Sequence, residues 1–297
     1  MDRDSDRCGY VALVGRPNVG KSTLLNHLLG RKLSITSRKP QTTRHNLLGV
    51  DTNGPVQAIY VDTPGIHDSG GRALNRHMVR TATSILTDVD VIVMVVERLR
   101  FGDGDRLVLE RIRSAPGKRL CVINKIDQLD DVTALLPHIA TLNDLGVFEE
   151  IIPISALRGT GLDRLKEAVR VRLPSGPHLF PPDQVTDRSE RFIAGEIVRE
   201  KLMRRLGDEL PHRITVVIER YVAKGRLVEI DATIFVEREG QKAIIIGRHG
   251  GMLKSVGQEA RKDIEALVGC KVMLRLWVKV KAGWTNDVAG LKRLGFD

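Results

Sequence analysis

Short apolar runs alternate with longer amphipathic stretches in the first part of the chain. The apolar runs are rich in β-branched residues, as expected of strands buried on both faces of a parallel sheet: Tyr10–Val14, Gln57–Val61, Val91–Val96, Leu120–Ile123 and Ile151–Ile154. Helices are expected between them, at Lys21–Leu29, Arg76–Leu86, Asp105–Arg113 and Gly161–Arg172. This alternation predicts an α/β domain with a mostly parallel sheet and helices on both faces.

A proline-rich stretch ends this pattern. Leu173–Asp183 contains four of the chain's 12 prolines. Proline restricts φ, lacks an amide donor and disfavours helix in the residue before it, so this stretch is expected to be a stiff linker. We therefore predict a first domain over residues 8–173, a linker over residues 174–186 and a second domain over residues 187–297.

The second domain has a different pattern. Asp187 and Glu190 have the spacing of a helix-start signal, and an amphipathic stretch follows to about Leu206. Strands are expected at Ile214–Arg220, Leu227–Val236 and Val272–Val280, and a helix at Leu253–Val268, while the type of Lys242–Ile246 stays open. These elements predict an α+β domain.

Composition describes a globular protein with an excess of positive charge. The 297-residue chain is 42% hydrophobic and has a net charge of +10. That charge favours a polyanionic partner, either nucleic acid or an acidic membrane face, with a merely basic soluble enzyme as the alternative. The three scattered cysteines favour a reducing cytoplasm. Met1–Arg7 lacks the apolar core of a signal peptide, and the longest apolar run has six residues, so any membrane contact is expected to be peripheral.

The first chemical motif lies between a predicted strand and a predicted helix. Gly15-x-x-x-x-Gly20-Lys21-Ser22 has the spacing of a phosphate-binding P-loop. Its glycines let the backbone turn so that several N–H groups face one phosphate, with the positive end of the helix dipole behind them. Lys21 is expected to bridge the β- and γ-phosphates of a nucleotide, and Ser22 to bind Mg²⁺.

A second motif, Asp62-Thr63-Pro64-Gly65, follows the strand Gln57–Val61. Asp62 stands where a Walker-B aspartate belongs and is expected to hold Mg²⁺ through water, and the Gly65 amide is expected to sense the γ-phosphate. Between this motif and the P-loop, Lys39–His45 is expected to be a switch loop that supplies a threonine to Mg²⁺. Thr43 is favoured over Thr42, and a polar loop without a metal ligand is the alternative.

A third motif identifies the base. Asn124-Lys125-Ile126-Asp127 follows Leu120–Ile123. Asp127 is expected to accept hydrogen bonds from the two donors of guanine, an arrangement that adenine cannot satisfy. Asn124 is expected to tie the loop together and the Lys125 stem to cover the base. Ser155-Ala156-Leu157 also ends a predicted strand, where the Ala156 amide would face the guanine carbonyl. The motifs therefore favour GTP over ATP.

In order and spacing, these motifs resemble those of the translation-factor-like GTPases across residues 10–170. The resemblance implies catalytic roles for Lys21, Thr43, Asp62 and Gly65, and Mg²⁺ ligation by Ser22, Thr43 and, through water, Asp62. It implies contacts to GTP or GDP from the following residues: Gly15, Arg16, Pro17, Asn18, Val19, Gly20, Lys21, Ser22, Asp62, Thr63, Pro64, Gly65, Ile66, Asn124, Lys125, Ile126, Asp127, Ser155, Ala156 and Leu157.

The residue after Gly65 bears on the rate of hydrolysis. Ras-like enzymes have a glutamine there that orients the attacking water. Here the position is Ile66, which has no polar group. His67 could serve instead, although a surface histidine without a catalytic role is the favoured interpretation. Slow intrinsic hydrolysis is therefore expected. Asn18 and the T-T-R of the switch loop resemble GTPases in which K⁺ supplies the charge of an arginine finger.

The second domain contains a candidate RNA-binding loop. Ile244–Gly250 reads I-I-I-G-R-H-G, the form of the G-x-x-G loop of a KH domain. From Lys242 to Lys281 there are nine basic and three acidic residues, an excess of six positive charges in 40 positions. Such an excess is expected of a phosphate-contacting groove, with a solvated helix face as the alternative. RNA contacts are expected from Gly247, Arg248, His249, Gly250, Lys254, Arg261 and Lys262.

The two halves together resemble the Era family of bacterial GTPases. The resemblance rests on G-R-P-N-V-G-K-S, Q-T-T-R-H and D-T-P-G-I-H in the first domain, and on V-E-R-E-G-Q-K and the tail Leu276–Trp284 (L-W-V-K-V-K-A-G-W) in the second. It implies an Era-type GTPase domain followed by a type II KH domain. It also implies binding near the 3′ end of 16S rRNA, a role in 30S subunit maturation, and a cytoplasmic monomer that meets the anionic inner membrane peripherally.

Three functions stay open on the sequence. The resemblance favours a switch in which GTP loads the protein onto rRNA and hydrolysis releases it. One alternative is a membrane-associated regulatory GTPase whose basic half contacts anionic lipid. The other is a passive rRNA-binding assembly factor in which the nucleotide is structural.

Overall fold

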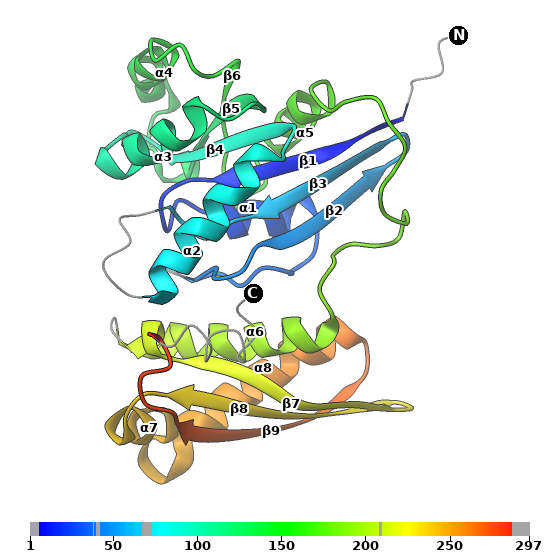
Figure 1. The fold of residues 1–297 in the computed structure, drawn as a ribbon, viewed down its shortest axis with the longest axis vertical. Coiled ribbons are helices and arrows are strands. Elements are labelled where there is room, and N and C mark those ends of the chain that lie inside the picture. Colours follow the sequence, from blue (N-terminus) through cyan, green and yellow to red (C-terminus); the bar gives the residue numbers. More distant parts are fainter. Residues whose placement is uncertain (1–5, 38, 40–41, 67–72, 208–209, 287–297) are drawn as a thin grey trace. The chain divides into compact units, whose positions relative to one another are not determined.

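The structure, a computed structural model, describes residues 6–37, 39, 42–66, 73–207 and 210–286. The chain divides into two units (Figure 1). The first comprises Met1–Ser34, Thr43–Ser69 and His77–Asp187, and the second comprises Ile35–Thr42, Gly70–Arg76 and Arg188–Asp297. The first unit is α/β and the second is α+β, which confirms the fold class predicted from the sequence.

A six-stranded sheet in the order β2-β3-β1-β4-β5-β6 forms the centre of the first unit. Its parallel strands correspond to the five apolar runs of the sequence, and β6 ends one residue before the last run does: β1 (Arg7–Val14), β3 (Val56–Asp62), β4 (Val91–Glu97), β5 (Lys118–Asn124) and β6 (Glu150–Pro153). The remaining strand, β2 (Leu47–Asn53), pairs antiparallel with β3, with Val50 opposite Ile59. The sequence did not predict β2, because this edge strand mixes apolar and polar residues instead of forming an apolar run.

Helices cover both faces of this sheet. α1 (Lys21–Leu28) and α5 (Leu162–Arg170) lie on one face, and α2 (Ala73–Ser84), α3 (Asp103–Arg113) and α4 (Leu135–Asn143) lie on the other (Figure 1). On the second face, Ala82, Ile112 and Leu142 are buried against strand residues such as Val14. Removing this apolar surface from water stabilises the fold by roughly 25 cal/mol per Å². The sequence did not predict α4.

The proline-rich segment packs along the first unit. Val50 donates its amide hydrogen to the Val185 carbonyl (2.8 Å). The buried Gln57 side chain bonds both the amide and the carbonyl of Phe180 (2.9 and 2.8 Å). The segment expected to be a separate linker is therefore part of the first unit, which ends at Asp187.

A three-stranded sheet in the order β7-β8-β9 forms the centre of the second unit. Its elements in chain order are α6 (Glu190–Arg205), β7 (Thr215–Lys224), β8 (Leu227–Val236), α7 (Glu239–Ile246), α8 (Gly251–Val268) and β9 (Lys271–Val280). β8 is antiparallel to β7 and parallel to β9. α6 and α8 pack on one face of the sheet, where Ile197, Ile230 and Ile264 are buried (Figure 1).

In the second unit, the structure corrects one prediction from the sequence and settles one element whose type was open. α6 begins after Ser189, whose hydroxyl accepts the Phe192 amide (3.3 Å), so the predicted start at Asp187 was wrong. The stretch Lys242–Ile246 is part of α7, a helix whose first turn is closed by the Gln241 side chain. Short 3₁₀ turns occur at Ile85–Thr87, Ile126–Gln128, Val132–Ala134, Leu210–Arg213 and Arg248–Gly250. Within the described residues, no helix has both the length and the apolar character to cross a membrane.

Candidate functional site

The phosphate-binding loop connects β1 to the first turn of α1. β1 ends at Val14 and α1 begins at Lys21. Gly20 has a φ of +104°, and a side-chain carbon there would lie 2.3 Å from Asn124 Nδ2, so glycine is required. Asn18 has a φ of +67°, which asparagine tolerates better than most residues. Both residues of the motif are therefore explained first by the shape of the loop.

Lys21 lies across this loop. Its ammonium donates to the carbonyl oxygens of Gly15 (2.9 Å) and Arg16 (3.0 Å), and the side chain is buried. Burial lowers the pKa of Lys21 to about 8, and the nearby Asp62 charge only partly opposes this effect. A phosphate group at the positive end of α1 would supply the negative charge that stabilises this buried ammonium.

Three hydroxyl groups converge on Asp62 at the end of β3. Its Oδ2 accepts hydrogen bonds from Ser34 Oγ (2.6 Å), Ser22 Oγ (2.7 Å) and Thr43 Oγ1 (3.3 Å). The Ser22 and Thr43 hydroxyl oxygens lie 2.8 Å apart. Thr42 instead donates to a carbonyl of its own loop (2.7 Å). The structure thus places Thr43, rather than Thr42, beside Ser22 and Asp62. Ser34 was not among the residues expected from the sequence.

This cluster fits a magnesium ion. Asp62 is fully buried, and burial raises the pKa of its carboxyl group. Its second oxygen, Oδ1, has no hydrogen-bond partner among the residues that the structure describes. A buried carboxylate oxygen without a partner is costly, and oxygen ligands of this kind are those that Mg²⁺ prefers. Ser22, Thr43 and Asp62 can therefore hold Mg²⁺ between them.

The loop after β3 runs directly against the phosphate-binding loop. A side-chain carbon at Gly65 would lie 2.8 Å from the Pro17 backbone nitrogen, so this approach requires glycine. Val19 and Pro64 are both buried. The Gly65 backbone is consequently close to the loop expected to bind the β-phosphate, where an amide could respond to the γ-phosphate.

The next residues are fixed by the core of the first unit. Thr63 Oγ1 donates to the Leu13 carbonyl (2.8 Å), and the Ile66 amide donates to the Gly15 carbonyl (3.3 Å). Ile66 is completely buried and packs in the core beside α2 and α3. Its side chain therefore has a structural role at the position where Ras-like enzymes have glutamine. The alternative water-orienting residue, His67, lies outside the described residues.

Asn124 joins the three loops expected to surround the nucleotide. It is buried at the end of β5, where its Nδ2 donates to the Val19 carbonyl (2.8 Å). Its Oδ1 accepts the amide hydrogens of Lys125 (2.8 Å) and Ala156 (2.9 Å). One side chain therefore holds the phosphate-binding loop, the N-K-x-D loop and the S-A-L loop together. The Ala156 amide, expected to face the guanine carbonyl, donates to Asn124 in this structure.

Asp127 is oriented by a neighbouring hydroxyl. Ser155 Oγ donates to Asp127 Oδ1 (2.6 Å), which fixes the carboxylate at the edge where β5 and β6 end. The Ile126 amide donates to the Ile154 carbonyl (3.3 Å), which ties the two loops together. Leu157 is exposed. The carboxylate is thus placed by residues from two separate motifs.

Glu97 was not among the residues expected from the sequence. It ends β4 at the same edge, opposite Asn124 in the register of β4 and β5. Its carboxylate pairs with Arg16 (2.6 Å) and with Lys125 (2.9 Å), and Arg16 also bonds Asp105 (3.2 Å). Burial would raise the pKa of Glu97, but hydrogen bonds and charges from Lys125 and Arg16 lower it overall. The sequence signal that could have identified Glu97 is a polar residue at the end of a buried strand, which Asn124 is as well.

A groove of about 440 Å³ lies between α8 and β9 of the second unit. It is lined by Gly250, Leu253, Lys254, Gly257, Gln258, Arg261, Leu274 and Leu276. Two exposed cations, Lys254 and Arg261, border it together with apolar side chains. Cations that can meet phosphates beside apolar surface that can meet bases suit single-stranded RNA.

The loop that enters α8 carries the other expected RNA contacts. Gly247, His249 and Gly250 all have positive φ (+72°, +50° and +74°). Arg248 and His249 are exposed on this loop. Lys262 is also exposed but does not line the groove. The structure thus brings Gly250, Lys254 and Arg261 of the expected set to the groove itself.

Both halves of the chain match known families. Residues 10–125 match the family described as 50S ribosome-binding GTPase, and residues 209–285 match the KH domain. The GTPase Era of Pseudomonas aeruginosa is 58% identical over 290 residues, which cover 98% of this chain and 95% of that protein. The GTPase Era of Azotobacter vinelandii is 57% identical over 295 residues, with coverage of 99% and 98%.

Solved Era structures are similar over nearly the whole length. Era in complex with MgGDPNP and nucleotides 1506–1542 of 16S ribosomal RNA is 39% identical, with a TM-score of 0.95 and coverage of 98% of this chain and 99% of that one. A variant of Aquifex aeolicus Era bound to GDP and tetrafluoroaluminate gives the same identity, coverage and TM-score. From a GTPase domain and a KH domain on one chain, and identity of this degree over almost all of its residues, we conclude that the chain belongs to the Era family of GTPases.

Proposed function

We propose that this protein is a GTP-hydrolysing switch that binds 16S rRNA near its 3′ end and acts in assembly and maturation of the 30S ribosomal subunit. One observation carries the proposal: a single chain contains both the Ser22–Thr43–Asp62 cluster and the basic groove between α8 and β9. The Era structure in complex with MgGDPNP and 16S rRNA nucleotides supports pairing these two ligands.

The nucleotide roles follow from the geometry of the first unit. Lys21 binds the β- and γ-phosphates, and Asp127 reads the guanine base. Mg²⁺ bound with GTP neutralises negative charge on the β- and γ-phosphate oxygens. Ser22, Thr43 and Asp62 are the residues assigned to that ion. Ile66 offers no polar group to a water molecule, which supports slow intrinsic hydrolysis.

Replacing Thr43 with alanine is expected to slow single-turnover GTP hydrolysis and to reduce the Mg²⁺ dependence of GTP binding. One hydroxyl leaves the Ser22–Thr43–Asp62 cluster, and a hydrogen bond or ligand contact to a charged group is worth about 1.5–3 kcal/mol, or roughly 10- to 100-fold. GTP affinity measured across a Mg²⁺ titration tests this. Thr42→Ala removes the same group one residue earlier and is the matched control. Equal effects of the two substitutions would contradict the assignment.

We also propose that K⁺ accelerates hydrolysis through the exposed Asn18 side chain. Single-turnover rates in K⁺ are expected to exceed those in Na⁺ by about tenfold or more, below the 10³–10⁵ of an arginine finger. Asn18→Gly keeps the positive φ of the loop but removes the side-chain carbonyl, so it should abolish the difference and leave the Na⁺ rate unchanged. Equal wild-type rates in the two salts would remove this part of the proposal.

The switch loop offers a physical basis for coupling. Ile35–Thr42 belongs to the second unit, where Arg199 of α6 donates to the Thr42 carbonyl. The fully buried Glu200 of α6 accepts an amide hydrogen from the same segment (2.9 Å). The next residue, Thr43, contacts the Asp62 cluster of the first unit. A nucleotide that orders Thr43 would therefore act on a segment bound to α6, which supports GTP-dependent RNA binding.

The test of the switch is rRNA affinity in two nucleotide states. The protein is titrated with RNA corresponding to 16S nucleotides 1506–1542, saturated either with a non-hydrolysable GTP analogue or with GDP. Binding is expected to be tighter with the analogue by about 5- to 150-fold, the range of common allosteric couplings. Identical affinities would reject the switch and leave the passive assembly factor. Absence of RNA binding in both states would reject the RNA function itself.

We extend the proposal to a cytoplasmic monomer that meets the inner membrane peripherally. The net charge of +10 supports attraction to an anionic leaflet. Cosedimentation with phosphatidylglycerol vesicles, compared with neutral phosphatidylcholine vesicles, tests the membrane contact. Equal recovery with both kinds of vesicle would remove it.

A further inference from the structure

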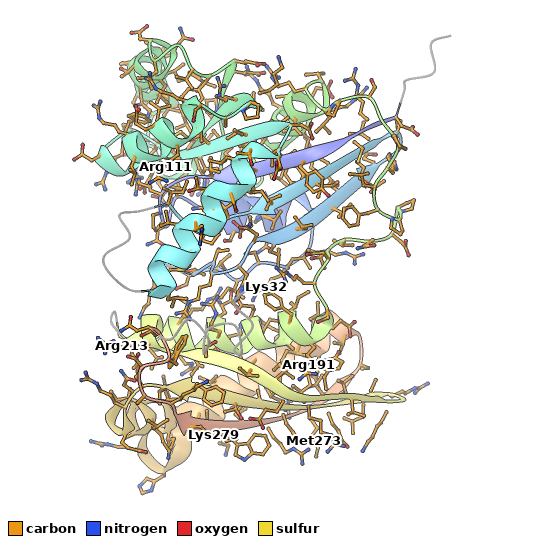
Figure 2. The ribbon with its side chains drawn as sticks, viewed as in Figure 1. Lys32, Arg111, Arg191, Arg213, Met273 and Lys279 are labelled. Carbon is orange, nitrogen blue, oxygen red and sulfur yellow. The ribbon has the colours of Figure 1, made fainter. Side chains whose placement is uncertain are left out.

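The sheet of the second unit has one face that α6 and α8 do not cover. Both helices contact the opposite face, and the exposure of β9 residues alternates strictly along the strand. On the outward face, Met273 is 46% exposed and Trp277 is 43% exposed, which is high for large apolar side chains. Figure 2 shows Met273 and Lys279 on the side of β9 away from α6. This surface is distinct from the groove described above.

Cations and apolar side chains alternate on the outward face of β9. The five residues that point outward are Lys271, Met273, Arg275, Trp277 and Lys279. None of them is acidic. Residues two apart in a strand lie on the same face, so the one exposed tryptophan has a cation on either side. The outward face of β9 is therefore a basic stripe with an aromatic side chain in it.

The acidic residues on this side of the sheet lie on β7 and β8, and cations neutralise them. Arg275 pairs with Asp231 (2.7 Å), and Lys279 pairs with Glu219 (3.2 Å). Glu229 is shared by two cations of β7 (3.1 and 2.8 Å). Lys271 pairs with Glu265 of α8 (3.9 Å), so five cations meet four carboxylates and the excess is one positive charge. This positive excess favours a polyanion such as RNA over a protein surface with an acidic rim.

An exposed tryptophan between cations has the chemistry of a base-stacking site. Proteins that bind single-stranded nucleic acid place aromatic side chains where bases stack and cations where phosphates pass. Trp277 meets the first requirement, and Arg275 and Lys279 meet the second. Trp284, the other tryptophan, is 1% exposed and belongs to the core.

The stripe and the groove share one strand. β9 is an edge strand, and its inward residues Leu274 and Leu276 line the groove beside α8. Its outward residues form the stripe. Because the strand is one residue thick, an RNA chain that leaves the groove can pass around its edge and reach Trp277. The position of the stripe next to the groove therefore favours RNA over a protein partner.

We propose that the outward face of β9 is a second surface for single-stranded RNA, on which Trp277 stacks against a base and Arg275 and Lys279 contact the flanking phosphates. The inference rests on the proposed RNA function and extends it. A KH groove holds about four nucleotides. The stripe therefore contributes only to RNA longer than the groove, and sets a longer footprint than the groove alone.

The protein has two tryptophans, which makes the proposal measurable by fluorescence. The full-length GTP-analogue-bound protein is titrated with the 1506–1542 segment of 16S rRNA and with an oligonucleotide of about five residues from it that fills only the groove. The long RNA is expected to quench Trp277, and the short RNA is not. Trp277→Phe, in which buried Trp284 is the only tryptophan, should show no quenching of tryptophan emission but keep most of the affinity.

Trp277→Ala is expected to weaken binding of the long RNA by about tenfold, within the range measured for one stacked base, and to leave the short RNA unaffected. Met273→Ala is the control for loss of an exposed apolar side chain on the same strand. Unchanged binding of the long RNA by Trp277→Ala would overturn the proposal. Equal loss for both RNAs would overturn it too, because the groove or fold would then be affected.

Two other results separate this proposal from its neighbours. If wild-type protein binds neither RNA, the proposed RNA function fails. If Trp277→Ala binds both RNAs normally but binds 30S subunits more weakly, the stripe docks a ribosomal protein, and the RNA proposal is overturned.

Discussion

Replacing Asp127 with asparagine is expected to lower GTP affinity by about 10³-fold and to raise affinity for xanthosine triphosphate. Guanine offers two donors, its ring N–H and its amino group, and each hydrogen bond to the carboxylate is worth about 1.5–3 kcal/mol. Asparagine loses that charge and presents an N–H₂ group to the guanine amino group. Xanthine has a carbonyl oxygen at that position, which the new N–H₂ can bond. Competition between labelled GDP and xanthosine diphosphate measures the change in base preference, because these nucleotides carry the same bases and are not hydrolysed.

The structure makes this substitution mild for the fold. Ser155 Oγ donates to Asp127 Oδ1, and an asparagine carbonyl oxygen can accept the same hydrogen bond. Asp130→Asn removes an exposed carboxylate three residues away and is the matched control, expected to leave GTP affinity unchanged. A loss of GTP binding without any gain for the xanthine nucleotide would show that Asp127 does not read the base.

The second large effect is expected at Lys21. Lys21→Ala removes the one lysine of the phosphate-binding loop, whose ammonium donates to two loop carbonyls in this structure. Each contact that this ammonium is expected to make to a phosphate oxygen is worth about 1.5–3 kcal/mol. GTP affinity should fall by about 10²- to 10³-fold, and single-turnover hydrolysis should become undetectable. Equilibrium binding and phosphate release measure the two effects.

Stability distinguishes lost binding from lost folding in this variant. Burial disfavours the charged form of Lys21, so its removal should leave the melting temperature of the nucleotide-free protein unchanged or higher. Lys118→Ala, at a 62% exposed side chain, is the control for losing a lysine. A much lower melting temperature would mean that Lys21 supports the fold. If Lys21→Ala still supports 30S assembly in cells, the nucleotide is structural and the passive factor is correct.

Buried strands were the elements most readable in the sequence. β1 and β4 lie inside the sheet with helices on both faces, so nearly every residue must be apolar and the run is continuous. β2 is an edge strand whose pairing with β3 depends on contacts outside its own residues. α4 has a proline, Pro137, in its first turn, where no helix hydrogen bond is lost. The local sequence pattern therefore does not predict an edge strand of mixed polarity or a helix with a proline in its first turn.

α7 shows how packing overrides local preference. Its I-I-I run is β-branched and favours a strand, which is why its type stayed open. In the structure the run lies in a helix, with Ile245 fully buried and Ile244 58% exposed. The Gln241 side chain closes the first turn by accepting the Glu237 and Arg238 amides.

Motifs whose chemistry lies within a few consecutive residues could be read from the chain alone. Three motifs predict the GTP site directly: G-R-P-N-V-G-K-S, D-T-P-G and N-K-I-D. Each brings backbone amides and one side chain together within a few consecutive residues. The fold class followed from the alternation of apolar runs and helices. The same letters could not choose between Thr42 and Thr43, because that choice depends on which hydroxyl reaches Asp62.

Contacts between distant parts of the chain required the folded molecule. Glu97 joins Arg16 to Lys125 because β4 lies between β1 and β5 in the sheet. The groove exists because α8 packs beside Leu274 and Leu276 of β9. Successive residues of a strand point to opposite faces, and Trp277 is exposed because it lies on the face that α6 and α8 do not cover. Sequence spacing carries no distance between separate strands, whereas strand order and register set those distances directly.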